Sequence, residues 1–320
     1  MADRVHPPID AEVDAALRAA GESLPSTITR EDIPRLREIA AAAAPSDLEL
    51  QRGDAIEIEE RTVPGSNGRP PVAVLICRPS KANMLLPGVY GIHGGEMAWG
   101  DARSGMTLVL DWVEQFGMIA VSVEYRLAPE FPHPAPVGDC YAVLNWTAEN
   151  AEQIGIDPDC LIVAGGSSGG GLAAAVTVMA RDFRGASLRG QILMYPLLDD
   201  RNLTPSSQEL MGEGTWNRAA SVMAWTALLG EARGGPAVPS YAAPSRETDL
   251  SQLPPAYLDV GSVDIFRDEV VDYAARMWRA GGAAELHVWL VDAMALTYSH
   301  HRQRYRRPAR QPACHGSNVS

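Results

Sequence analysis

One stretch constrains the fold of this chain more than any other: residues 161–175 read Leu-Ile-Val-Ala-Gly-Gly-Ser-Ser-Gly-Gly-Gly-Leu-Ala-Ala-Ala. An apolar run of strand length leads into a glycine-rich turn, and an alanine-rich segment typical of a helix start follows. Residues 165–169 match Gly-x-Ser-x-Gly, whose glycines let a strand and a helix pass close together. The pattern predicts a strand–turn–helix unit that holds the Ser167 hydroxyl out of a sharp corner.

A hydroxyl held in this way can act as a nucleophile where a base reaches it. The N–H of Ser168, at the start of the helix, would then point to the place where an oxyanion forms. The pentapeptide alone is equally compatible with a structural or phosphate-binding turn. A Walker-A phosphate site is excluded, because no Gly-Lys-Ser/Thr follows the glycines.

The composition is that of an ordinary globular protein, with 46% hydrophobic and 21% charged residues among 320. The net charge of −13 argues against a nucleic-acid or anionic-membrane binder. The four cysteines show no CxxC pair, which favours buried free thiols. We find no apolar signal core and no segment long enough to span a membrane, and we therefore expect a cytoplasmic location.

Strand-like and helix-like segments alternate along most of the chain. The expected strands are Ala55–Val63, Val72–Arg78, Gly88–His93, Met118–Glu124, Leu161–Ala164, Gln191–Tyr195, Ala256–Val260 and Ala284–Trp289. The expected helices between them are Met106–Gln115, Pro136–Ala148, Leu172–Arg181 and Arg267–Ala280. A Gly-, Asn- and Pro-rich turn should join the first two strands as a hairpin. The alternation predicts a mostly parallel sheet covered by helices on both faces.

Three further motifs follow expected strands. His93-Gly94-Gly95-Glu96 follows the third strand, and its adjacent glycines leave backbone N–H groups uncovered, as an oxyanion pocket requires. Residues 125–130 read Tyr-Arg-Leu-Ala-Pro-Glu, and residues 264–268 read Asp-Ile-Phe-Arg-Asp. Together with the serine turn, these motifs stand at the carboxyl ends of strands, where the loops of a parallel sheet meet.

The four motifs, in this order, resemble those of the hormone-sensitive-lipase-like family of α/β-hydrolases, which holds bacterial carboxylesterases of the heroin-esterase-like kind. That family carries His-Gly-Gly-Gly, Tyr-Arg-Leu-Ala-Pro-Glu, Gly-Asp-Ser-Ala-Gly-Gly and Asp-Pro-Leu-Arg-Asp. The resemblance covers roughly residues 50–289. It implies the α/β-hydrolase fold, with a mostly parallel eight-stranded sheet, helices on both faces and a helical cap. It also implies Ser167 as nucleophile, Asp264 as the acid that orients a histidine, and an oxyanion hole at Gly94, Gly95 and Ser168.

The resemblance also divides the chain into regions. Residues 51–198 and 235–289 would form the catalytic domain, and residues 199–234, polar and Trp-containing, would form a cap insertion. Residues 1–50 would form an N-terminal cap segment with expected helices at Ala11–Ala20 and Thr29–Ala44. Residues 290–320 are an atypical basic tail that we expect to be irregular.

Several of these residues have plainer interpretations. His93 is expected to support its loop through a hydrogen bond rather than to act as the base. Asp264, judged by spacing alone, would more often cap the helix that follows it, and Asp268 is a rival acid that we interpret as a first-turn carboxylate. Met97, Trp99 and Trp216 could line an acyl or alcohol pocket, although ordinary packing explains each one alone.

Glu96, Gly166 and Ser168 depart from the family pattern. Glu96 replaces the third glycine, and an ionised carboxylate that faced a developing oxyanion would oppose catalysis, although its N–H could still donate if the side chain turned to solvent. Gly166 and Ser168 replace an aspartate and an alanine beside the nucleophile, which we expect to be tolerated.

The most serious departure is the base. The family places a His-Gly-Phe loop about thirty residues after the acid, and Met294 stands at the histidine position here. From Leu290 onward the chain carries five arginines against one acid, Asp292. Residues 292–297 can be encoded GAT GCC ATG GCT TTG ACT, which another frame reads as Cys-His-Gly-Phe-Asp. We therefore hypothesise a frameshift just after Trp289. If the tail is genuine, His300, His301 or His315 would have to serve as base, and His287 is interpreted as structural.

The sequence thus predicts a serine carboxylesterase that acts on short- to medium-chain esters, without metal or cofactor, and that is impaired if the histidine is absent. Two alternatives stay open: a catalytically dead hydrolase-fold binding protein, and an amidase or lactonase that uses the same site. The expected partner is a small-molecule ester, with no nucleic acid and no membrane, and a homodimer is possible.

Overall fold

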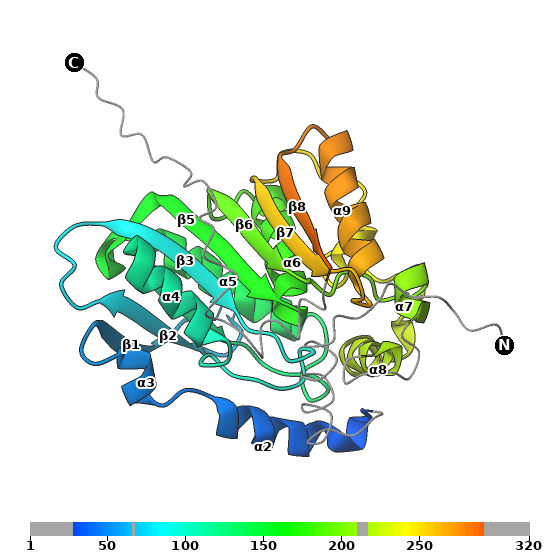
Figure 1. The fold of residues 1–320 in the computed structure, drawn as a ribbon, viewed down its shortest axis with the longest axis horizontal. Coiled ribbons are helices and arrows are strands. Elements are labelled where there is room, and N and C mark those ends of the chain that lie inside the picture. The colour runs from blue at the N-terminus through cyan, green and yellow to red at the C-terminus, as the bar shows by residue number, and fades with distance from the viewer. Residues whose placement is uncertain (1–27, 66–67, 210–216, 291–320) are drawn as a thin grey trace.

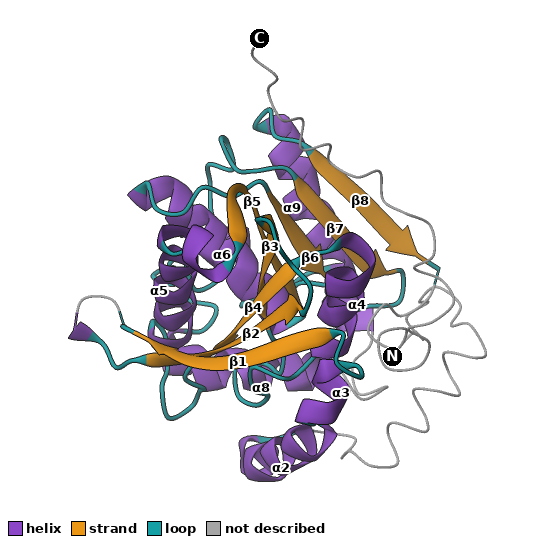
Figure 2. Cartoon of the chain, turned by 90° about the vertical axis from the view of Figure 1, so that its left-hand side faces the viewer, coloured by secondary structure: helices purple, strands orange, loops and turns teal. Residues whose placement is uncertain are grey.

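The computed structural model describes residues 28–65, 68–209 and 217–290, and these build one twisted sheet with helices on both faces (Figures 1 and 2). The eight strands are β1 (Ile56–Val63), β2 (Val72–Pro79), β3 (Leu86–Ile92), β4 (Ile119–Glu124), β5 (Ile156–Gly166), β6 (Gly190–Met194), β7 (Ala256–Gly261) and β8 (Ala284–Trp289). Their order across the sheet is β1-β2-β4-β3-β5-β6-β7-β8. The pairs β1–β2 and β2–β4 are antiparallel, and the other five are parallel. The predicted fold class is confirmed.

Helices cover the two faces of this sheet unequally. They are α2 (Ile33–Ala43), α3 (Asp47–Gln51), α4 (Met106–Phe116), α5 (Ala135–Glu149), α6 (Ser168–Phe183), α7 (Pro205–Glu209), α8 (Arg218–Leu229) and α9 (Arg267–Arg279). Short 3-10 turns are η1 (Arg30–Asp32), η3 (Glu152–Ile154), η4 (Gly230–Ala232) and η5 (Pro244–Arg246). Helix α4 lies on one face, and α5 and α6 lie on the other (Figure 2).

Sequence composition explains which strands lie in the middle. β4 reads Ile-Ala-Val-Ser-Val-Glu and is buried at every position except the last, as expected of a strand with helices on both sides. β1, at the edge, alternates apolar and charged residues and leaves much of its length accessible. The core therefore sits around β3, β4 and β5, and three of the four motif-bearing loops leave the carboxyl ends of these strands, while the loop of Asp264 follows β7.

Some boundaries differ from the sequence-based expectation. β5 begins at Ile156 rather than Leu161, because Ile156 pairs with Leu86 of β3 ahead of a bulge. Helix α6 begins at Ser168 rather than Leu172, so three glycines of low helix propensity are helical at its start. Helix α3 was not predicted, although Ser46 and Glu49 form a capping box around it.

Elements expected to form a cap lie beyond the carboxyl ends of the parallel strands (Figure 1). The predicted helix at residues 29–44 is present as η1 and α2, and α7 and α8 are the described helices of the 199–234 insertion. α2, α8 and the loop after β3 share a small apolar cluster of Ile28, Ile33, Leu36, Ala98, Trp99 and Ala220. The expected helix at residues 11–20 and the basic tail from residue 291 lie outside the described residues. Within the described ranges, every helix falls short of the length and apolarity that a bilayer crossing requires.

Candidate active site

Ser167 occupies the corner between β5 and α6, as the sequence predicts. Its backbone has φ 55° and ψ −126°, a left-handed conformation that is rare for a residue with a side chain. Neighbouring backbone holds it there: its N–H donates to Met194 O at 2.9 Å, and its carbonyl accepts from Leu197 N at 3.0 Å and Gly171 N at 3.1 Å. The residue remains partly exposed. These hydrogen bonds hold the left-handed backbone of Ser167 from both sides while the residue stays partly exposed, which suits a nucleophile.

The glycines beside Ser167 are required by close approach. A Cβ on Gly165 would lie 2.3 Å from Gly169 O, and one on Gly169 would lie 2.2 Å from Ile92 O. Each of these contacts is with backbone, which cannot move aside as a flexible side chain can. The Gly-x-Ser-x-Gly pattern is therefore needed for the strand, the helix and the end of β3 to meet at this corner.

The loop after β3 lies directly against the corner. A Cβ on Gly94 would be 3.5 Å from Ser167 Cβ and 3.0 Å from Gly166 O. Met97 N donates to Ser168 Oγ at 3.2 Å, which ties the loop to the first turn of α6. Within the described part of the chain, the backbone N–H groups of Gly94, Gly95 and Ser168 donate no hydrogen bond. These N–H groups lie in the loop and the helix turn that meet at Ser167, where the sequence predicts an oxyanion hole.

The same loop adopts an unusual backbone path. Gly95, Glu96 and Met97 have φ of 103°, 55° and 57°, and two of these three residues carry side chains. Ala98 N and Trp99 N both donate to Gly95 O, at 2.8 and 2.9 Å, which closes a tight turn. A Cβ on Gly95 would lie 2.1 Å from Trp99 O. Consecutive left-handed residues carry strain that the surrounding structure must overcome.

Glu96 does not turn to solvent. Its side chain is 3% exposed, and its Oε2 is buried with no hydrogen-bond partner among the described residues. Burial raises the pKa of Glu96 to about 8, because the charged form is costly away from water. The carboxyl is therefore protonated at neutral pH. An ionised carboxylate, which would oppose an oxyanion, is therefore avoided because the buried Glu96 carboxyl is neutral, and not because it is exposed to solvent.

His93 supports its loop, as predicted. Its Nδ1 lies 2.7 Å from Gly94 O, and its ring stacks on Tyr125 with centroids 4.1 Å apart. The Tyr125 hydroxyl donates to His93 O at 2.9 Å, which joins the Tyr-Arg-Leu-Ala-Pro-Glu motif to the glycine loop. Burial lowers the pKa of His93 to about 4. The ring is a neutral, structural imidazole at ordinary pH.

Asp264 lies in the loop between β7 and α9, with its side chain 4% exposed. Its Oδ1 accepts from Phe266 N at 2.8 Å, so it does stabilise the start of the following helical turn. The backbone N–H of Asp264 donates to Gly261 O, and its carbonyl accepts from Arg267 N. This buried position after β7 is compatible with both roles considered for Asp264, namely the acid that orients a histidine and the cap of the following helix.

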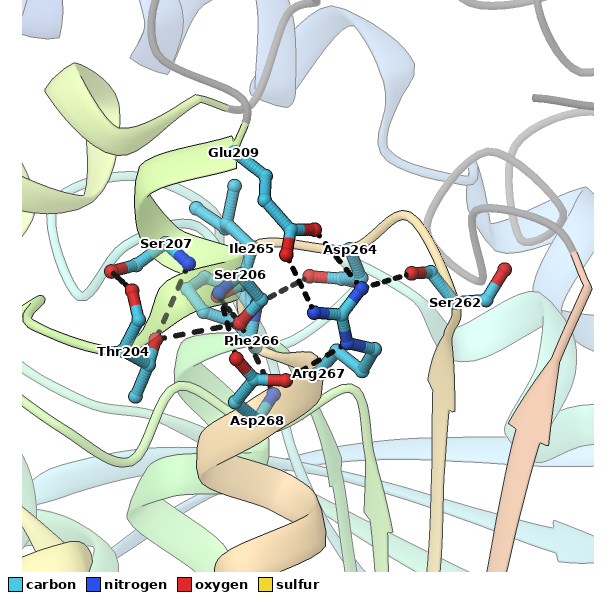
Figure 3. A network of polar contacts seen from close by, with 10 residues as sticks. All are labelled: Thr204, Ser206, Ser207, Glu209, Ser262, Asp264, Ile265, Phe266, Arg267 and Asp268. Atoms are coloured by element: carbon cyan, nitrogen blue, oxygen red, sulfur yellow. Dashed lines mark hydrogen bonds and ion pairs between the residues drawn. The ribbon is translucent and has the colours of Figure 1, made fainter. Parts of the chain in front are cut away.

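The loop of Asp264 is attached to α7, in the segment expected to form a cap, by the polar network in Figure 3. Arg267 bonds Ser262 O at 2.7 Å and the carboxylate of Glu209 on α7 at 3.0 and 3.1 Å. Asp268 accepts from Ser206 N at 2.7 Å, and Ser206 Oγ donates to Ile265 O at 3.0 Å. These contacts give Asp268 the structural role that we expected for it.

The remaining predicted residues are placed as follows. Met97 and Trp99 are buried, Trp99 in the cluster with α2 and α8, and their role as pocket residues stays a prediction. Trp216 and Met294 lie outside the described residues. His287, in β8, lies 2.7 Å from Glu285 and stacks on Trp289, in keeping with a structural role. Among the residues described, no three His, Cys, Asp or Glu side chains gather as metal ligands would.

Two contacts of the site were not foreseen from the sequence. Arg37 of α2 donates hydrogen bonds to the glycine loop and to the loop after β4. Glu269 of α9 accepts from Leu198 N at 2.7 Å, next to Leu197, whose N–H bonds the Ser167 carbonyl. Burial raises the pKa of Glu269.

A surface cavity of about 470 Å³ near Arg30, His133 and Leu228 includes none of the predicted site residues.

Comparison with known proteins agrees with this geometry. A family model described as alpha/beta hydrolase fold matches residues 89–292, which is more than half of the chain. The chain belongs to the α/β-hydrolase fold family. Carboxylesterase NlhH of Mycobacterium tuberculosis is 33% identical over 282 residues, which cover 86% of each chain. The predicted resemblance to the hormone-sensitive-lipase-like branch is confirmed.

Solved structures of this family superpose closely. A bacterial heroin esterase is 36% identical, with a TM-score of 0.82, and the match covers 92% of both chains. Esterase LipW from Mycobacterium marinum is 33% identical, with a TM-score of 0.75, over 89% of this chain and 88% of that one. These matches cover most of the chain and agree with the α/β-hydrolase fold described above.

Proposed function

We propose that this chain is a serine carboxylesterase that hydrolyses short- to medium-chain carboxylic esters. The observation that carries the proposal is the corner at Ser167, where a partly exposed serine lies against the glycine loop, and where the N–H groups of Gly94, Gly95 and Ser168 donate no hydrogen bond in the described part of the chain. The named relatives are esterases, which supports the reaction class.

In the proposed mechanism, Ser167 Oγ attacks the ester carbonyl and forms a tetrahedral intermediate. The N–H groups of Gly94, Gly95 and Ser168 stabilise the negative charge on its oxygen. A histidine takes the serine proton and passes it to the leaving alcohol, and Asp264 holds that imidazole in the required tautomer. Water then attacks the acyl-enzyme by the same route and releases the acid.

The base is the weak point of the printed chain, because Met294 stands where the histidine is expected. We propose that a frameshift after Trp289 accounts for the substitution and for the basic tail. Without the imidazole, the oxyanion donors and substrate binding would leave only a small fraction of the rate. Met294 also favours a second candidate function, which is ligand binding on a hydrolase frame without turnover.

An ester assay distinguishes these functions. We expect turnover of p-nitrophenyl acetate and butyrate that Ser167→Ala abolishes, because the acyl-enzyme cannot form without the hydroxyl. The measurement is initial release of p-nitrophenol at several substrate concentrations. Asp268→Asn serves as a matched carboxylate control, whereas Asp264→Asn should reduce kcat strongly.

Equal rates for the parent chain and Ser167→Ala would contradict a reaction at this site. Stoichiometric binding of an ester analogue without product would instead support the binding function. Preference for amide or lactone substrates over the two esters would keep Ser167 as nucleophile and change only the substrate class.

A further inference from the structure

Arg37 joins three separate parts of the molecule at one guanidinium. It projects from α2, and its Nε donates to Ala98 O at 2.8 Å in the glycine loop. Its Nη2 donates to Ala128 O at 3.0 Å, in the loop after β4. Both terminal nitrogens also bond the Glu130 carboxylate, at 2.8 and 2.7 Å. A planar fork with fixed donors is the group that can make this set of contacts at once.

The two carbonyls that Arg37 binds belong to neighbouring backbone segments. Ala128 N donates to Met97 O at 2.8 Å, so the two segments are already paired at one point. Arg37 adds a second connection through Ala98 O and Ala128 O. The paired segments are those that carry the left-handed residues Gly95, Glu96 and Met97. Because such a path is strained, contacts that fix its far end hold the N–H groups of the loop in place.

Apolar contacts reinforce the same attachment. Ile33 and Leu36, one turn apart on α2, are buried against Ala98 and Trp99. The Arg37 hydrogen bonds lower the pKa of Glu130 to about 2, so this carboxylate stays ionised and the pair stays charged at ordinary pH. The side chains of Arg37 and Glu130 are 32% and 54% exposed, so solvent screens this ion pair and the hydrogen bonds from Arg37 to the two carbonyls matter more to the attachment.

We propose that Arg37 is a positioning residue, which holds the backbone donors of the oxyanion loop at Ser167 through Ala98 and Ala128. The N-terminal helix α2 thereby contributes to transition-state stabilisation without touching the substrate. The inference rests on the proposed function, because the donors matter to the rate only if an oxyanion forms beside Ser167. Deleting an oxyanion donor slows related reactions by about 10²–10³, and a displaced loop should cost somewhat less.

The first test compares Arg37→Met, Arg37→Lys and Glu130→Gln with the full chain. We expect kcat for p-nitrophenyl butyrate to fall roughly 10- to 100-fold in Arg37→Met, with KM changed by less than about threefold. Arg37→Lys should fall less, since an ammonium group can satisfy one carbonyl but not the fork. The rate of Ser167 labelling by a fluorophosphonate, followed by intact mass, should fall in the same order.

The matched control is Arg52→Met. Arg52 forms ion pairs with Asp111 and Glu114 and bonds Thr107 O, so it joins α3 to α4 with a comparable fork and makes none of the loop contacts. We expect this variant to lose some stability and to keep its kcat. A kcat loss in Arg52→Met as large as in Arg37→Met would overturn the assignment, since it would reflect general destabilisation.

A second measurement does not depend on turnover. The amides of Ala98 and Trp99 both donate to Gly95 O, so their hydrogen exchange reports the order of the loop. We expect exchange in the peptide that spans residues 97–99 to be about tenfold faster in Arg37→Met and unchanged in Arg52→Met. Unchanged exchange in Arg37→Met would overturn the inference. If the parent and Ser167→Ala react equally with the fluorophosphonate, the proposed function fails, and the exchange result still decides whether Arg37 orders the loop.

Discussion

Glu96 is the residue at which the chemistry of the site and the local sequence conflict. An ionised carboxylate beside the three expected oxyanion donors would repel the negative charge that those donors are expected to stabilise. Burial at 3% exposure keeps the carboxyl protonated at neutral pH. This burial costs stability, because the Oε2 of Glu96 finds no hydrogen-bond partner in the described part of the chain.

The raised pKa of Glu96 predicts a particular dependence of stability on pH. Below about 4.5 the carboxyl is protonated in both states; between 4.5 and 8 the unfolded chain releases the proton and the folded chain keeps it. The free energy of unfolding should therefore fall as pH rises through this window, by roughly 1.4 kcal/mol per unit from this group, and level off above pH 8. Urea unfolding of the parent and Glu96→Gln, at pH 5, 6, 7 and 8, checks the slope.

Glu96→Gln is isosteric and cannot ionise, so it should gain stability relative to the parent chain as pH rises. Glu130→Gln is the contrasting carboxylate, because the pKa of Glu130 is lowered to about 2 and its contribution is constant above pH 5. Parallel stability curves for Glu96→Gln and the parent chain would show that the buried carboxyl does not hold its proton.

At the scale of elements, the contact between α6 and the end of β3 decides whether the nucleophile corner can form. Gly169 is the residue on which this contact depends, since an added Cβ would meet Ile92 O at 2.2 Å and His93 O at 2.5 Å. Gly169→Ala should lower the free energy of unfolding by roughly 1–3 kcal/mol, because backbone must shift to admit the methyl group. It should also reduce ester turnover, since the displaced strand end carries the glycine loop.

Gly190→Ala is the matched control for this change. Gly190 begins β6, and an added Cβ there would lie 3.4 Å from Pro255 O, which is an ordinary contact. Denaturant unfolding and the ester assay on both variants give the comparison. Equal stability of Gly169→Ala and Gly190→Ala would mean that the close approach at the corner is not a constraint.

Elements that carry a local pattern were predictable, and those fixed by distant contacts were not. The Gly-x-Ser-x-Gly corner, the glycine loop and the hairpin follow from residues that lie next to one another in the chain. Arg37 and Glu130 are separated by 93 positions, and neither residue type nor spacing indicates that they meet. The burial of Glu96 was likewise hidden, because exposure depends on what packs over the loop. The early start of β5 depends on its partner strand.

At the scale of the whole molecule, two helices that are far apart in the sequence each hold one loop of the candidate site. Helix α2 holds the glycine loop through Arg37, and α7 holds the loop of Asp264 through Arg267 and Ser206. Segments before and after the central strands thus secure opposite sides of the corner at Ser167. We therefore expect a change in the final segment of the chain to leave these two loops in place and to affect only what that segment itself supplies.

Because the contacts that hold these loops come from α2 and α7, the effect of restoring the tail can be predicted. A chain whose residues after Trp289 are translated in the frame that reads Cys-His-Gly-Phe-Asp should hydrolyse p-nitrophenyl butyrate at least roughly 10³-fold faster than the printed chain, because the base returns to an intact site. Ser167→Ala in the restored chain should remove the gain, and Met294→His alone should recover part of it. Reading the gene's DNA across codon 289 checks the premise. If the other frame contains no His-Gly-Phe, or if the restored chain is no faster, the printed tail is genuine and the ligand-binding function becomes the better account.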